Sequence, residues 1–353
     1  MNVSNGMDLT KEDNQMAKGL AIIGMVLLHL FCRLGELPYE PMLHIGETPF
    51  VYYIGLFGDL CVPVFCFCSG YAHYLLREKK KEKYTYVVRD KIIALLKNYW
   101  CILILFSILG LLFDGKGLIP GNINNFLGNL LLYKLSYNGA WWFLLTYIIL
   151  IIISPVIVKI VKRFKWIHVV LVSGILYFIF YIFRFIYVFS FESELFSWIW
   201  QQLVLLGTSQ FAYVIGMIFR KTEVMTKLKS LLADKDIMRK AIVFFVPIIL
   251  FLIHCVEQSL IIAPITGLGT IVCFFLWNKP QSIKRVFMFM GEHSTNIWLI
   301  HMFFYATLFV DFVFVVKYPI CIFGMMMGLC IVTSLIVQRI LKNLNKFIVC
   351  LER

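Results

Sequence analysis

Apolar runs of about 20 residues recur along the whole chain, and they restrict its possible folds more than any other feature. The hydrocarbon core of a bilayer is about 30 Å thick, so a helix needs about 20 apolar residues to cross it. Hydrophobic residues make up 61% of the 353 residues, charged residues only 15%, and the mean hydropathy is +0.84. A soluble domain has about 25% charged residues. The sequence therefore predicts an all-α, polytopic membrane protein.

The apolar runs predict ten transmembrane helices within a single membrane domain. Their predicted ranges are 16–34, 51–74, 92–112, 141–161, 167–188, 197–219, 241–254, 260–277, 294–316 and 320–340. This divides the chain into a cytoplasmic N-terminal segment (1–15), a ten-helix membrane domain (16–340) and a cytoplasmic tail (341–353). The first segment is polar and lacks the short apolar core of a cleaved signal peptide.

Positive charge alternates between the two sides of these spans. With the N-terminus in the cytoplasm, 27 of the 33 Lys and Arg residues fall in inner segments. Cytoplasmic loops of membrane proteins carry this excess of Lys and Arg. The charge pattern predicts that both termini are cytoplasmic, and it explains the net charge of +13 without nucleic acid. In the outer loop after the third span, residues 122–134 predict an amphipathic surface helix.

The first span contains a histidine, His29, and begins close to Lys18. The two are eleven residues apart, which on a helix places them on one face about 16 Å apart. An ionisable side chain inside a span is costly and indicates a functional site. The alternative for His29 is a buried histidine that hydrogen-bonds a neighbouring helix, and for Lys18 a snorkelling lysine at the helix end.

The ten cysteines lie almost all in apolar runs, without Cys-x-x-Cys pairs. They are interpreted as packing residues, and neither disulfide nor zinc spacing is present. We predict no metal site.

Several sequence islands resemble one family of membrane enzymes. The islands are Lys18-x10-His29, Cys61-Val-Pro-Val-Phe-Cys-Phe-Cys-Ser-Gly-Tyr71, the basic Arg89-Asp-Lys-Ile92, Trp141-Trp-Phe-Leu144 and Gly291-Glu-His-Ser-Thr-Asn-Ile-Trp-Leu-Ile-His301. In this order they are similar to motifs of the acyltransferase-3 family of integral membrane O-acyltransferases. Lys18 stands where the family has Arg, and Lys97-Asn98-Tyr99 stands where many members have a proline. The resemblance covers nearly the whole chain and predicts a stand-alone enzyme without an appended esterase-like domain.

The resemblance implies transfer of an acyl group, usually acetyl, from acyl-CoA to a hydroxyl of a surface glycan or lipid-linked sugar. Such a transfer needs a base to take the hydroxyl proton, and a neutral imidazole suits that task. We expect His29 to be this base. Asp59 is a candidate partner that would orient the His29 ring, since the second span brings it to a similar depth.

Further residues are candidates for binding the two substrates. For the donor these are Lys18, Arg89 and Lys91, near the CoA phosphates, and Ser294, Trp298 and His301 along the donor path. The predicted ninth span places His301 near its inner edge and lower than His29. For the acceptor the candidates are Trp141, Trp142 and Arg184. The alternatives are helix packing for the 294–301 face, an aromatic belt for the tryptophans, and topology or snorkelling for the cations.

The expected function is therefore that of an acetyl-CoA-dependent O-acetyltransferase of the inner (cytoplasmic) membrane, modifying an envelope polysaccharide among membrane lipids. Two alternatives from other classes remain at this point. One is a transporter or flippase of polysaccharide or lipid-linked sugar without acyl-transfer chemistry, although no internal duplication is visible. The other is a structural subunit of a polysaccharide-synthesis complex, for which the His and Lys inside the first span would be unneeded.

Overall fold

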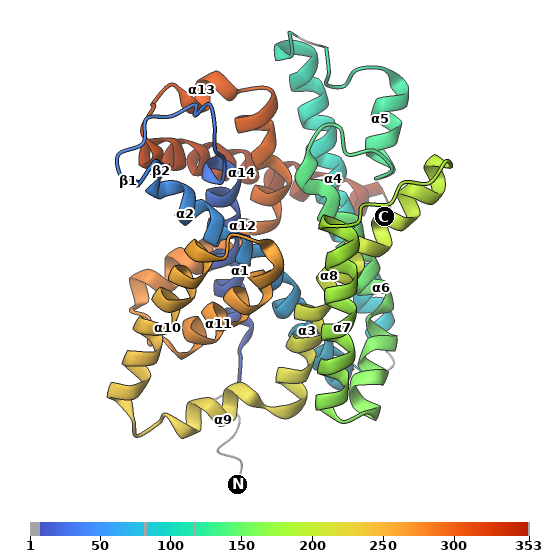
Figure 1. The fold of residues 1–353 in the computed structure, drawn as a ribbon. Helices are drawn as coiled ribbons and strands as arrows, with labels where there is room; N and C mark the ends of the chain where they lie inside the picture. The colour runs from blue at the N-terminus through green and yellow to red at the C-terminus, as the bar shows by residue number, and fades with distance from the viewer. Residues whose placement is uncertain (1–7, 81–82, 116, 352–353) are drawn as a thin grey trace.

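The computed structural model describes residues 8–80, 83–115 and 117–351, with side chains up to residue 346. The predicted terminal segments extend beyond this range at residues 1–7 and 352–353. Almost all elements are helices, and the exception is a small antiparallel hairpin of β1 (His44–Ile45) and β2 (Thr48–Pro49). Figure 1 shows most long helices running between the end that carries α9 (Val224–Leu231) and the opposite end, where α5 (Ile123–Leu130) and α13 (Val310–Phe314) lie.

The helices follow the chain in this order. They are α1 (Lys11–Phe31), α2 (Phe50–Phe57), η2 (Gly58–Leu60), α3 (Cys61–Lys80), α4 (Tyr84–Phe113), α5 (Ile123–Leu130), η4 (Gly139–Trp141), α6 (Trp142–Arg163), α7 (Trp166–Phe185), α8 (Glu194–Thr222), α9 (Val224–Leu231), α10 (Asp236–Val256), η5 (Leu260–Ile262), α11 (Ala263–Leu276), α12 (Gln281–Met302), η6 (Phe303–Thr307), α13 (Val310–Phe314) and α14 (Pro319–Leu351).

Within the described ranges, eight helical segments are long and apolar enough to cross a membrane. The eighth and ninth predicted spans correspond to the shorter segment Leu260–Leu276 and to α12. The all-α, polytopic membrane fold predicted from the sequence is confirmed. The predicted surface helix is present as α5, whose first turn is capped by the Asn122 side chain.

Several helix boundaries differ from the prediction. Helix α1 begins at Lys11, because Thr10 and Asp13 form a capping box that fixes its first turn. Helix α14 continues to Leu351 and so runs through most of the predicted tail. Helix α12 begins at Gln281 rather than at residue 294, and it ends at Met302, where the wider turn η6 and the short α13 take over.

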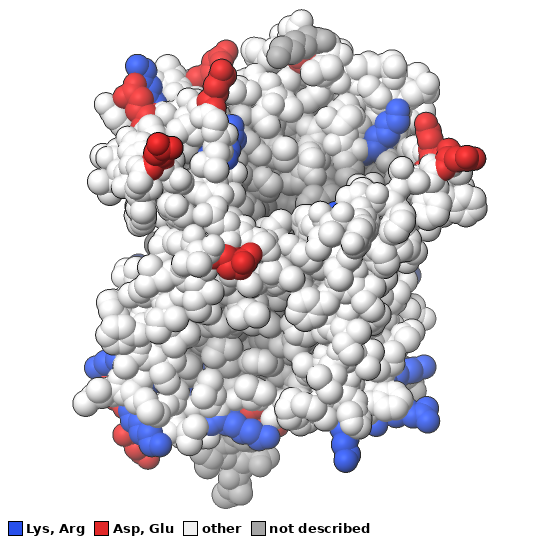
Figure 2. Space-filling view, in the orientation of Figure 1, with Lys and Arg blue, Asp and Glu red and all other residues white. Residues whose placement is uncertain are grey.

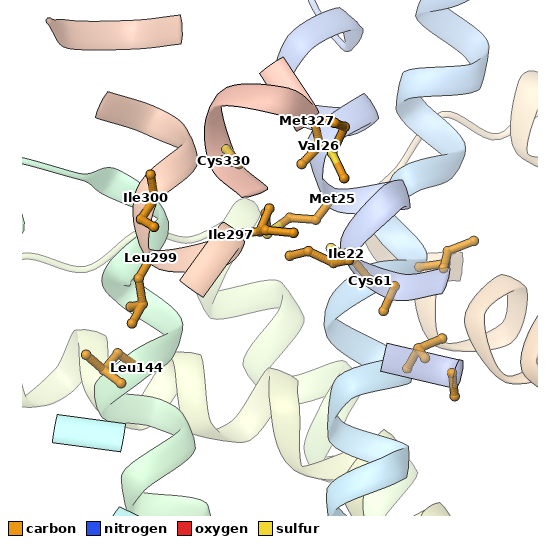
Figure 3. Packing of buried hydrophobic residues seen from close by; sticks show 14 of the residues in the cluster. Ile22, Met25, Val26, Cys61, Leu144, Ile297, Leu299, Ile300, Met327 and Cys330 are labelled. Carbon is orange, nitrogen blue, oxygen red and sulfur yellow. The ribbon is translucent and has the colours of Figure 1, made fainter. Parts of the chain in front are cut away.

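Helices α1 and α12 touch backbone to backbone. A Cβ on Gly19 would collide with the carbonyl oxygen of Phe287, and one on Gly291 would collide with that of Gln15. Small residues at helix contacts allow the close packing that holds membrane helices together, since lipid supplies no hydrophobic driving force between them. Figure 3 shows the apolar side chains above this contact, with Ile22, Met25 and Val26 of α1 near Ile297 of α12 and Met327 of α14.

The second predicted span is broken near its outer end. Its residues form α2, one tight turn (η2) and then α3, and Asp59 lies in the middle of that turn. The turn packs against α1 at Gly58, where a Cβ would collide with the carbonyl oxygen of Gly24. Non-helical backbone at membrane depth occurs where it is buried in protein or lines a cavity. This break places the Asp59 side chain inside the bundle, 4% exposed.

Candidate active site

One cavity of about 270 Å³ is lined by residues from eight α-helices and from the short turns η2, η4 and η5. Its wall includes Lys18 and His29 of α1, Asp59 of η2, and Trp298 of α12. Other polar or aromatic lining residues are Ser69, Trp142, Tyr147, Tyr177, Tyr181, Arg184, Thr208, Ser209 and Thr295. We call this the central cavity. Most of the predicted catalytic and substrate-binding residues therefore meet in one place.

His29 lies against His301, which is buried behind it. The two ring centroids are 4.9 Å apart, and His301 in turn stacks on Tyr305 at 5.9 Å. His29 lines the central cavity, whereas His301 is fully buried. Arg33 closes this group on its outer side, because its guanidinium lies 5.6 Å from the Tyr305 ring and donates to the His29 carbonyl oxygen.

The hydrogen bond of His301 fixes its tautomer. Its Nδ1 lies 2.8 Å from the carbonyl oxygen of Trp298. A carbonyl oxygen only accepts, so Nδ1 carries the proton and Nε2 presents a lone pair. That Nε2 atom is buried and has no hydrogen-bond partner among the described residues. Of the two rings that contact His301, that of His29 lies closer, with 4.9 Å between ring centroids against 5.9 Å for Tyr305.

The predicted depth of His301 needs correction. We expected it about seven residues from the inner edge of its span and below His29. Since α12 begins at Gln281, His301 lies 20 residues from the helix start, a rise of about 30 Å. His29 lies 18 residues from the start of α1, a rise of about 27 Å. The two histidines are thus at similar depth, and their rings are in contact. The predicted ninth span had placed His301 too low to make this contact certain.

The expected pairing of Asp59 with His29 is also corrected. Asp59 Oδ2 instead lies 2.8 Å from Nε2 of His254, which comes from the outer end of α10. His254 Nδ1 bonds the carbonyl oxygen of Glu257 at 2.9 Å. The physical reason is the break at η2, which turns Asp59 toward α10. Sequence reasoning gave His254 no role, although a histidine near the end of an apolar run is itself a signal.

The predicted acceptor residues separate into two groups. Trp142 and Arg184 line the central cavity, and the guanidinium lies 4.7 Å from the Trp142 ring and donates to Thr208 Oγ1 at 2.9 Å. Trp141 is fully buried, and its Nε1 donates to the Leu299 carbonyl oxygen at 3.0 Å. Its predicted role in stacking on a sugar is corrected to packing, because no face of its ring reaches the cavity.

The predicted donor residues also lie in different places. Lys18 and Trp298 line the cavity, and the Trp298 Nε1 donates to the Ala140 carbonyl oxygen at 3.0 Å. Ser294 is buried and bonds Gly291 within its own helix. Arg89 and Lys91 are exposed on the inner part of α4, where Arg89 pairs with Asp90 at 3.2 Å. Their role in donor binding stays a prediction.

The two ends of the molecule differ in charge. In Figure 2, most basic side chains of the visible face lie toward the end that carries α9 in Figure 1, and most acidic side chains lie toward the other end. This is the charge difference that the positive-inside rule associates with a cytoplasmic and an outer side, and the cytoplasmic side stays a prediction. Lys18 lies in the first half of α1, toward the basic end, while His29 and Arg184 lie near the opposite ends of their helices.

A histidine-lined cavity inside a helical membrane bundle defines a protein that can carry out acid–base chemistry within the bilayer. The sequence model of a family described as "Acyltransferase domain" matches residues 15–339. The chain therefore belongs to the acyltransferase-3 family and is a multi-pass membrane acyltransferase. Comparisons with individual curated proteins and with solved structures give no significant match. Among the described residues, no group of three or more His, Cys, Asp or Glu side chains is placed to hold a metal ion.

Proposed function

We propose that this protein is an inner-membrane enzyme that transfers an acyl group, specifically acetyl, from acyl-CoA to a hydroxyl of a cell-envelope glycan. The observation that carries the proposal is the position of His29, which faces the central cavity with its ring against the buried His301. Family membership supplies the acyl-transfer chemistry. The acetyl group, the CoA carrier and the glycan acceptor are the parts that we propose.

In this proposal His29 is the general base. Its neutral imidazole takes the proton of the acceptor hydroxyl while the hydroxyl oxygen attacks the thioester carbonyl carbon. The new C–O bond forms, the C–S bond breaks, and the proton passes from the imidazolium to the departing CoA thiolate. The products are an ester and free CoA. His29 would also be the base in a two-step reaction in which the acyl group is first transferred to the enzyme and then to the acceptor hydroxyl.

His301 is proposed as a positioning residue behind the base. With its Nδ1 proton committed to the Trp298 carbonyl oxygen, its Nε2 can accept a hydrogen bond only from a neighbouring donor. A bond from one nitrogen of His29 would leave the other nitrogen unprotonated and facing the cavity. The buried partner would also stabilise the imidazolium that forms during transfer, as the orienting member of a catalytic triad does.

The substrates are proposed to enter from opposite sides. Acyl-CoA would approach from the cytoplasm, with Lys18 at the inner end of the cavity attracting its phosphates and Trp298 along the acyl path. A lysine acts here as a point charge rather than as the bidentate fork of an arginine. The glycan hydroxyl would approach past Trp142 and Arg184 from the outer side.

Transfer of radiolabelled acetyl from acetyl-CoA, measured with purified protein in nanodiscs, tests this function. The wild-type protein should form labelled ester on envelope glycan, and His29→Ala should reduce the rate by about 10²- to 10⁴-fold, the usual contribution of a general base. His44→Ala, at an exposed histidine of β1, is the matched control and should retain the rate. A wild-type protein that moves glycan but consumes no acetyl-CoA would instead be a transporter.

A further inference from the structure

Asp59, which lines the central cavity, and His254 behind it form a second polar pair, apart from the His29–His301 pair. Both side chains are almost completely buried, at 4% and 1% exposed. The carboxylate comes from the break in the second span and the imidazole from α10. A buried ionisable pair within a membrane bundle is costly and indicates a functional site. The mechanism above makes no use of it.

The hydrogen bonds of the pair account for three of its four polar atoms. His254 Nδ1 donates to the Glu257 carbonyl oxygen at 2.9 Å, and His254 Nε2 shares one proton with Asp59 Oδ2 across 2.8 Å. The fourth atom, Asp59 Oδ1, is buried and has no hydrogen-bond partner among the described residues. Leaving a buried carboxylate oxygen unpaired costs more than an ordinary hydrogen bond is worth, so an external partner is expected.

That unpaired oxygen belongs to a residue that lines the cavity. Two other polar side chains of the same lining already have partners, because the Tyr177 hydroxyl bonds the Ile261 carbonyl oxygen and the Tyr181 hydroxyl bonds Ser259. Ser209 Oγ is a second buried, unpartnered atom of the same lining. A ligand that satisfies a carboxylate oxygen must bring a hydrogen-bond donor, and one that satisfies both atoms must bring more than one polar group.

We propose that Asp59, held in place by His254, binds the acceptor by accepting a hydrogen bond from a sugar hydroxyl with its free Oδ1 atom. This inference rests on the proposed function, and it assigns the outer part of the central cavity to a polyhydroxylated acceptor. Asp59 is then a substrate-binding residue rather than the partner of His29. His254 is a positioning residue, since it fixes one carboxylate oxygen and leaves the other unpaired.

The test separates binding of the acceptor from binding of the donor. Purified protein in nanodiscs is assayed with acetyl-CoA and with envelope polysaccharide that has been stripped of its esters by mild alkali. The main variant is Asp59→Leu combined with His254→Leu, which replaces both polar partners by apolar groups of similar size and leaves no orphaned imidazole. The second variant is His254→Gln, which can still hydrogen-bond Asp59 but holds it less firmly.

For the double variant we expect the Michaelis constant for polysaccharide to rise by roughly 10- to 100-fold, the usual worth of a hydrogen bond to a charged group. The Michaelis constant for acetyl-CoA should change far less. His254→Gln should give a smaller rise for polysaccharide in the same direction. The control is His293→Leu combined with Ser334→Ala. These two residues form another buried hydrogen-bonded pair, with 2.8 Å between His293 Nδ1 and Ser334 Oγ, and both lie outside the cavity lining. Its Michaelis constant for polysaccharide should equal that of the wild-type protein.

Equal Michaelis constants for polysaccharide in the wild type and in both variants would overturn this inference and leave the proposed function standing. An equal rise in the control would show that any buried pair has the same effect, and it would overturn the inference as well. A wild-type protein that forms no ester in this assay would overturn the proposed function, and the inference with it.

Discussion

His29 and His301 each lie ten residues beyond a glycine at which their two helices touch. Gly19 of α1 packs on the backbone near Gly291 of α12, and both helices run toward the outer side from that contact. Ten residues correspond to a rise of about 15 Å, so the histidines reach the same level. The ring contact of 4.9 Å is thus set by the glycine contact below it.

Replacing His301 should slow the chemistry more than it weakens donor binding. His301→Leu removes the ring behind His29 and the hydrogen bond that this ring donates to the Trp298 carbonyl oxygen. We expect kcat to fall by roughly 10-fold or more, which is less than the loss on removing the base itself. His301→Asn restores a donor to Trp298, but its shorter side chain places no acceptor where His301 Nε2 lies, so it should recover thermal stability without recovering kcat. A His301→Leu enzyme with wild-type kcat would contradict the positioning role.

A larger residue at position 291 should separate the two histidines. Gly291→Val would push α12 away from the carbonyl oxygen of Gln15, and such overpacking costs about 1–3 kcal/mol. The midpoint of thermal unfolding should fall, and acyl transfer should fall with it. Gly328→Ala is the matched control, because no atom lies within 4 Å of a Cβ at that position. If both variants retain the wild-type midpoint and rate, the glycine contact does not position the site.

Binding of the donor phosphates should depend on Lys18 more than on Arg89 and Lys91, the exposed basic pair of α4. Lys18→Gln is expected to raise the Michaelis constant for acetyl-CoA, while Lys18→Arg should preserve it because the charge is kept. The comparison is the double variant Arg89→Gln with Lys91→Gln, whose side chains lie outside the cavity lining. A rise only in that double variant would move the phosphate site to the inner end of α4.

Lys279 should make stability depend on pH in the alkaline range. It lies between α11 and α12, 8% exposed, where its ammonium donates to the carbonyl oxygens of Phe274 and Trp277. Burial lowers the pKa of Lys279 to about 8, against about 10.4 in an unfolded chain. Between these values the unfolded chain binds more protons, so the contribution of Lys279 to stability increases as the pH rises through this window.

The measurement for Lys279 is the thermal midpoint of the wild type and of Lys279→Met at about pH 7.5 and about pH 9.5. The variant loses two hydrogen bonds, so its midpoint should be lower at both pH values. The informative quantity is the change in the thermal midpoint between the lower and the higher pH. This change should favour the wild type over Lys279→Met, because only the wild type has a lysine whose contribution to stability increases over this range. Identical changes in the two proteins would show that the Lys279 pKa does not differ between the folded and unfolded states.

The fold could be predicted from the sequence because the bilayer imposes a length and a polarity on each span. Apolar runs and the placement of Lys and Arg were sufficient for the all-α membrane architecture. The exception was α12, whose inner half contains Lys284 and Arg285 and so lacks the apolar signal of a span. Its start at Gln281 was marked only by Pro280, which commonly precedes or opens a helix.

Several residues of the candidate site could be predicted, but not their pairings. His29, Lys18 and Arg184 were found because charged or titratable groups stand out in apolar runs. Which ring lies against which depends on helix rotation and depth, and an error of 13 residues in the start of α12 moved His301 by about 20 Å along its axis. Equal spacing of Gly19 to His29 and of Gly291 to His301 was the signal in the sequence that could have aligned them.

The small size of the central cavity has a consequence for how the reaction relates to the membrane. Its volume of about 270 Å³ lies just below the range of pockets that enclose a whole drug-sized ligand. A nucleotide carrier and a glycan chain cannot both fit within it. In the proposed function, only the acyl end of the donor and the acceptor hydroxyl therefore enter the cavity, one from each side. Only the acyl group then passes from the cytoplasmic face to the outer one. In this proposal the protein modifies the cell exterior with a cytoplasmic metabolite without translocating either substrate.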